Sequence, residues 1–101
     1  MDNKYRDLVS EQLFGRQMRL RVLAFVAAHP TGTTWQGQVS DAVGGNPTES
    51  GKELDRLVSI GLLQPPQRES KASKKIYKRV DNHPVWAPLV TLLDTLDKAG
   101  P

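Results

Sequence analysis

The chain has no cysteine, which excludes disulfides, thiolate metal ligands and thiol nucleophiles but leaves the redox compartment open. Long apolar runs are also missing: the longest candidate, residues 22–28, is far shorter than a membrane-spanning helix. Arginines precede this run as in a signal peptide. Because Asp7 and Glu11 lie upstream and the helical spacing continues there, we interpret the run as part of a core helix. We therefore expect a cytoplasmic protein with no membrane segment.

Residue sets that carry enzymatic chemistry are missing as well. The two histidines, His29 and His83, are far apart in the sequence, and no cluster of other ligands supports either of them as a metal site. There is no serine, histidine and carboxylate cluster and no phosphate-binding loop of the GxxxxGK[ST] type. We expect a protein that is not an enzyme and that uses no metal or cofactor.

Positive charge is concentrated in one segment, although the net charge of the chain is only +3. Between residues 64 and 80 a single acid, Glu69, stands against the basic residues Arg68, Lys71, Lys74, Lys75, Lys78 and Arg79. Such a cluster favours a polyanionic partner. An ordinary solvated loop explains the charge alone about equally well.

The first apolar pattern predicts a long helix over about residues 8–29, after a polar segment, about residues 1–7, that we expect to be frayed. Its stripe recurs at helical spacing through Phe14, Met18, Val22 and Phe25. Pro30 and Gly32 end the helix. A chain of 101 residues is expected to form one domain with a modest core.

Residues 34–61 predict two helices joined by a tight turn. Gly44 and Gly45 accept a positive φ readily, so they suit a sharp reversal of the chain. Asn46 is a natural N-cap for the second of these helices, and Gly61 is a natural stop. Two helices around such a turn, the second with one apolar and one polar face, form a helix-turn-helix.

Residues 62–80 predict a β-hairpin with a basic tip, because Pro65 and Pro66 forbid a helix and residues 75–80 alternate. A last helix is expected over about residues 85–98. Its leucine stripe, beside the first helix, predicts a dimer interface, and packing within the monomer explains each single leucine equally well. The interface residues of this prediction are Leu13, Phe14, Leu89, Leu92, Leu93 and Leu96.

Several short motifs follow one another along the chain: Leu13-Phe-Gly-Arg16 with Leu20-x-x-Leu23, Gln38-Val-Ser-Asp-Ala-Val-Gly44, Leu54-x-x-Leu57-x-x-x-Gly61-Leu62-Leu63, Ile76-Tyr77-x-x-Val80, and Asn82-His-Pro84 with Leu89-x-x-Leu92-Leu93. In this order and spacing they resemble the ArsR-like superfamily of winged helix-turn-helix regulators, over roughly residues 13–96. The resemblance implies a single domain over residues 1–101 that is mostly α-helical with a small β-hairpin. Three helices, two strands and a closing helix would follow in that order.

The resemblance also implies a homodimer that places its third helix in the major groove of double-stranded DNA and its hairpin, the wing, against the backbone. On that helix Thr48, Lys52 and Arg56 lie opposite the apolar stripe, where lysine or arginine can contact guanine edges or phosphates. Thr34 and Gln36 would meet the backbone from the preceding helix. Metal-sensing members carry cysteine or histidine ligands that this chain lacks, so metal binding is not implied. The wing's expected phosphate contacts are Arg68, Lys71, Ser73, Lys74 and Lys75.

Two functional hypotheses follow. The first is a dimeric, sequence-specific DNA-binding transcriptional regulator that represses by occluding a promoter. The alternative is an adaptor that uses a winged helix for protein–protein contacts without base-specific DNA binding. Three acids on the proposed recognition helix, Glu49, Glu53 and Asp55, favour the adaptor, and the basic hairpin favours DNA.

Overall fold

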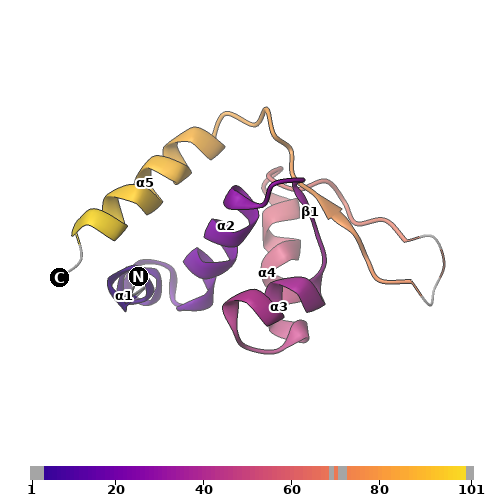
Figure 1. Ribbon diagram of the computed structural model, residues 1–101, viewed down its shortest axis with the longest axis horizontal. Helices are drawn as coiled ribbons and strands as arrows, with labels where there is room; N and C mark the ends of the chain where they lie inside the picture. The colour runs from indigo at the N-terminus through magenta and orange to yellow at the C-terminus, as the bar shows by residue number, and fades with distance from the viewer. Residues whose placement is uncertain (1–3, 69, 71–72, 100–101) are drawn as a thin grey trace.

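The computed structural model describes residues 4–68, 70 and 73–99, and helices make up most of this part of the chain (Figure 1). The predicted composition, mostly α-helical with a small antiparallel β component, is confirmed. None of the helices in these residues is long and apolar enough to cross a membrane. The elements are α1 (Lys4–Phe14), α2 (Met18–Ala28), β1 (Thr33–Thr34), α3 (Gln36–Val43), α4 (Pro47–Ser59), β2 (Tyr77–Lys78) and α5 (Trp86–Ala99).

The prediction of one long helix over residues 8–29 is wrong, because the chain breaks at Gly15 into α1 and α2. Gly15 has a φ of 80°, in the left-handed region that glycine adopts without a steric penalty, and its amide donates to the carbonyl of Glu11 at 2.9 Å. Beside the break Ser10 is buried, and its Oγ accepts a hydrogen bond from the amide of Leu20 at 3.1 Å. Apolar spacing did not reveal the break because it continues on both sides of Gly15.

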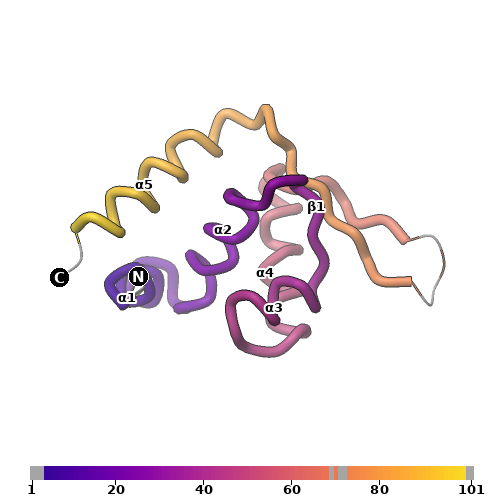
Figure 2. Tube along the Cα trace, viewed as in Figure 1, coloured from indigo at the N-terminus to yellow at the C-terminus, as the bar shows by residue number. Residues whose placement is uncertain are grey.

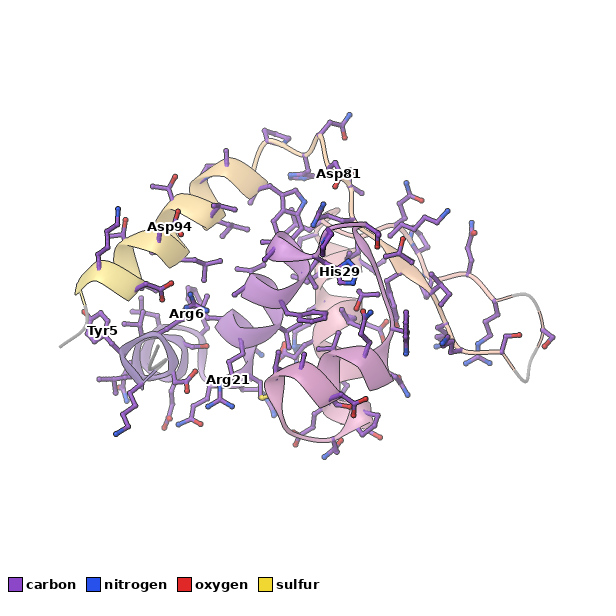
Figure 3. The ribbon with its side chains drawn as sticks, viewed as in Figure 1. Tyr5, Arg6, Arg21, His29, Asp81 and Asp94 are labelled. Carbon is purple, nitrogen blue, oxygen red and sulfur yellow. The ribbon has the colours of Figure 1, made fainter. Side chains whose placement is uncertain are left out.

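α1 begins at Lys4, within the segment 1–7 that we predicted to be frayed. Two ion pairs hold it. Arg6 points from α1 toward α5 and pairs with Asp97 at 2.5 Å, and Asp7 pairs with Arg21 of α2 at 2.5 Å (Figure 3). Charged residues that looked solvent-facing in the sequence therefore attach α1 to the rest of the fold.

The two helices around the glycine turn form as predicted. Gly44 and Gly45 have φ values of 87° and 81°. The side chain of Asn46 caps α4 by accepting a hydrogen bond from the amide of Glu49 at 2.9 Å. Where α3 and α4 pack, a Cβ on Gly51 would lie 2.5 Å from Oε1 of Gln36, the end of an exposed side chain that can move aside.

After α4 the chain forms a hairpin arm, residues 62–68 and 73–80, that extends away from the helices (Figure 2). Its two sides meet at bridges between Leu63 and Arg79 and between Gln67 and Ile76. β2, in the second side, also pairs antiparallel with β1, a strand too short for sequence periodicity to predict. The arm is therefore joined through β1 to the segment that leads into α3.

Arg79 attaches the base of the hairpin arm to the end of α2. Its Nη1 donates to the carbonyls of Val26, Ala27 and His29 at 2.7, 3.1 and 2.8 Å, which satisfies groups that the helix end leaves free. Its Nε pairs at 2.6 Å with Asp81, in the turn before α5 (Figure 3). Arg79 belongs to the basic cluster of the sequence but acts as a helix cap.

The predicted dimer residues divide into three groups. Leu93 and Leu96 are only 5% and 8% exposed and belong to the monomer's own core, so their assignment to a dimer interface is wrong. Leu89 and Leu92 are half-buried and pack against this core. Leu13 and Phe14, at the end of α1, are exposed. The leucine spacing of α5 was correct, but it mainly reflects packing against α1 and α2.

The break at Gly15 gives a stability prediction. A Cβ added there would have no heavy atom within 4 Å, so Gly15→Ala tests the positive φ alone. We expect it to lower the free energy of unfolding by about 1 kcal/mol, measured by urea denaturation. Gly37→Ala, inside α3 and 3.6 Å from Trp35 Cδ1, is the control and should raise it by about 0.5–1 kcal/mol. A neutral Gly15→Ala would contradict a left-handed break.

Candidate nucleic-acid interface

The outward face of α4 carries the residues expected to contact DNA. Thr48, Lys52 and Arg56 recur every fourth residue and therefore share one face of the helix. All three are exposed, whereas Ser50 and Leu54 on the opposite face are completely buried. The structure thus brings these three predicted residues together on one accessible surface.

Two of the acids on α4 have partners within the protein. Glu53 is buried, and its carboxylate lies 3.3 Å from Arg19 Nε and 3.5 Å from Arg56 Nε. Asp55 is exposed and accepts a hydrogen bond from the hydroxyl of Tyr77 at 2.7 Å. The two arginines offset the charge of Glu53, whereas the neutral hydroxyl leaves the charge of Asp55 in place, so only Glu53 repels an approaching polyanion less than its position in the sequence suggested.

Tyr77 joins the hairpin arm to α4. Its side chain is almost completely buried, and it pairs with Thr34 of β1. Burial raises the pKa of Tyr77 above its ordinary value, and the hydrogen bond to the Asp55 carboxylate raises it further. The hydroxyl therefore stays protonated at neutral pH and acts as the donor. Strand alternation indicated which side of the arm Tyr77 occupies, but its partner in α4 was not predictable from local sequence.

Of the two residues expected to meet the DNA backbone near the start of α3, one is accessible. Gln36 is exposed at the start of α3, next to Gly51 of α4. Thr34 is only 1% exposed, so the expectation that its side chain meets the DNA backbone is wrong. It belongs to β1, where it pairs with Tyr77 of β2.

One lysine side chain of the arm contacts the residue that precedes α3. Nζ of Lys74 lies 3.8 Å from the ring centroid of Trp35, a cation–π geometry that places a positive charge beside α3. Lys75 and Arg68 are exposed. Ser73 is half-buried, with its Oγ 3.0 Å from Oγ of Ser70.

Lys71, the remaining predicted contact of the arm, lies outside the described residues. Lys74, Lys75 and Arg68 thus remain candidates for phosphate contacts, since all three are exposed. Local sequence patterns could not predict the contact between Trp35 and Lys74, because the two residues come from segments far apart in the chain.

Within the part of the chain that the structure describes, no group of three or more histidine or carboxylate side chains could hold a metal ion. Comparison of the chain with models of protein families, with curated proteins and with solved structures finds no match. The function must therefore be inferred from the surface formed by α4, the start of α3 and the hairpin arm.

The Tyr77–Asp55 bond gives a second prediction. Tyr77→Phe should lower the free energy of unfolding by about 1 kcal/mol near neutral pH, measured by urea denaturation. The same substitution in an Asp55→Ala background should cost much less, because the partner is already gone. Equal costs in the two backgrounds would show that the bond contributes nothing.

The raised pKa of Tyr77 also predicts how this stability depends on pH. The pKa of Tyr77 is higher in the folded protein than in the unfolded chain, where it has its ordinary value of 10.0. The protonated hydroxyl therefore stabilises the fold fully at pH values below 10, and this contribution is lost as the pH rises further. The wild-type protein should therefore lose stability above pH 10 more steeply than Tyr77→Phe. Parallel curves for the two proteins would count against a buried, protonated Tyr77.

Proposed function

We propose that the chain is a winged helix-turn-helix protein that binds double-stranded DNA and regulates transcription. In this proposal α3 and α4 form the helix-turn-helix and the hairpin arm is the wing. α4 enters the major groove, which is wide enough for a helix, and the wing lies along the backbone. The observation that carries the proposal is that the exposed face of α4, the start of α3 and the arm lysines are held together by the Tyr77–Asp55 bond and the Lys74–Trp35 contact.

The roles of the side chains follow from their chemistry. Lys52 and Arg56 contact guanine edges or phosphates from α4, and Thr48, in its first turn, meets a phosphate near the positive end of the helix dipole. Arg56 is half exposed although it pairs with Glu53, so part of its guanidinium remains accessible. The remaining backbone contacts come from Gln36, Arg68, Ser73, Lys74 and Lys75.

The proposal includes a homodimer and repression. Two copies related by a two-fold axis would place their α4 helices in successive major grooves, about 34–36 Å apart, so the operator would be an inverted repeat. Leu13 and Phe14 are exposed and Leu89 and Leu92 partly exposed, which leaves them available for contact between copies. Occupation of a promoter by such a dimer would prevent transcription.

An adaptor without DNA binding was the alternative, and its main support was the acidity of α4. That support weakens at Glu53, which is buried and paired with two arginines, whereas Asp55, bonded to the neutral hydroxyl of Tyr77, keeps its charge. A basic wing beside the exposed face of α4 fits a polyanion better. An absence of binding at low salt, both to DNA from upstream of its own gene and to a scrambled duplex, would restore the adaptor hypothesis.

The wing gives a third prediction. Replacing Lys74 and Lys75 together with alanine should weaken binding to all duplexes and reduce the slope of log affinity against log salt by about one per lost phosphate contact. Fluorescence polarisation at several salt concentrations measures this slope. Lys98→Ala is the control, because Lys98 is exposed near the end of α5, on the opposite side of the molecule from the arm (Figure 1). An unchanged slope in the double variant would contradict the wing as a phosphate clamp.

The recognition helix gives a fourth prediction that the wing does not share. Lys52→Ala should reduce the discrimination between the upstream duplex and a scrambled one by about 1–3 kcal/mol, if Lys52 contacts a base edge. Lys75→Ala should lower the affinity for both duplexes by the same factor, because phosphate contacts carry no sequence information. Competition titrations with the two duplexes give both values. Equal losses for Lys52→Ala on the two duplexes would place Lys52 on the backbone.

A further inference from the structure

An open groove of about 510 Å³ lies between α2, the end of α4 and the start of α5. Its walls are mainly apolar and include Leu20, Leu23, Leu57, Leu89 and the exposed Ile60. Phe14, Leu89 and Leu92, which the proposed homodimer would use, also line it, so a second copy and a ligand would compete for this surface. The volume falls within the range of small-molecule sites, which are concave, largely apolar and carry a few placed polar groups. We call this surface the leucine groove.

One end of the leucine groove is positively charged. Arg19, Glu53 and Arg56 line that end, and a smaller adjoining cavity of about 130 Å³ shares Glu53 and Arg56. The smaller cavity is also lined by Arg16, Lys52 and Glu49. Four cations thus face two carboxylates, and one of these, Glu53, already pairs with Arg19 and Arg56. The end of the groove carries an excess of positive charge.

We propose that the leucine groove binds an amphiphilic carboxylate, a fatty-acid-like molecule whose chain lies along the leucines and whose head group meets Arg56, Arg16 and Lys52. An apolar chain removes the leucine walls from water, and a carboxylate matches the unbalanced cations at one end. The Arg56–Glu53 distance of 3.5 Å leaves Arg56 able to turn to a second carboxylate while Glu53 keeps Arg19 at 3.3 Å.

The proposed ligand acts on the DNA-binding surface because Arg56 and Lys52 belong to both sites. A carboxylate bound there neutralises cations that would otherwise face DNA, so the ligand and DNA oppose each other's binding by the same factor. This regulatory step rests on the proposed function, whereas the binding of the ligand to the groove does not.

Ligand binding is tested on the free protein by isothermal titration with dodecanoate below its micelle concentration. Dodecyltrimethylammonium, with the same chain and the opposite charge, is the ligand control. We expect dodecanoate to bind at least about tenfold more tightly than the ammonium. Arg56→Gln, at a half-exposed position that the fold tolerates, should remove most of this preference. Equal binding of the two amphiphiles would overturn the proposal.

The chain's contribution is tested with a matched pair of variants. Ile60→Asn changes a 61% exposed residue of the groove and should lower the affinity for dodecanoate about tenfold. Leu8→Asn changes a 52% exposed residue of α1, which does not line the groove, and should leave binding unchanged. Equal effects of the two variants would overturn the groove as the site. The proposal would also be overturned if the wild type bound no dodecanoate and Ile60→Asn lost self-association. A second copy of the chain would then occupy the groove.

The regulatory step is tested separately by measuring DNA affinity with and without saturating dodecanoate, where we expect a loss of about fivefold or more. Binding of dodecanoate without binding of DNA would support the groove as a ligand site and contradict the proposed function. Binding of DNA without binding of dodecanoate would support the proposed function and contradict the groove as a ligand site. DNA affinity that is unchanged by bound dodecanoate would reject the coupling alone.

Discussion

The hydrogen bond between Tyr77 and Asp55 is the contact on which the arrangement of the surface depends. It joins the hairpin arm to α4, and the pairing of Tyr77 with Thr34 joins the same arm to the segment before α3. Tyr77 is buried whereas Asp55 is exposed, so the bond lies at the edge of the core, where it fixes how the arm meets α4. α3, α4 and the arm therefore present their outward faces as one unit.

The charges of this unit explain how a chain of modest net charge can suit a polyanion. On α4 the carboxylate of Glu53 is buried against Arg19 and that of Asp55 binds Tyr77 of the arm, while Glu49, Lys52 and the arm lysines are exposed. Some arginines, in contrast, make contacts within the fold: Arg79 caps the end of α2, and Arg21 forms an ion pair with Asp7 of α1. Counting charges in a sequence cannot separate these roles, because a side chain's partner is set by the fold. The surface is more positive than the composition of its elements suggests.

Local chemistry predicted the turn at Gly44, the Asn46 cap, and the change from helix to hairpin after Gly61, since each depends on a few neighbouring residues. The outward position of Thr48, Lys52 and Arg56 also followed, because helical spacing fixes which residues share a face. Contacts between distant segments did not follow. The burial of Thr34 depends on β2, more than forty residues later, and that of Leu93 and Leu96 on the way α5 packs against earlier helices. The break at Gly15 was local, but continuous apolar spacing concealed it.

The central claim, that α4, the start of α3 and the arm form a single DNA-binding surface, is tested most directly by NMR. Backbone amide shifts would be followed during titration with a duplex from upstream of its own gene. The account predicts that the largest changes fall together on Thr48, Lys52 and Arg56 of α4, on Gln36, and on Lys74 and Lys75 of the arm. Changes concentrated on α1 and α5, or no changes at low salt, would contradict it.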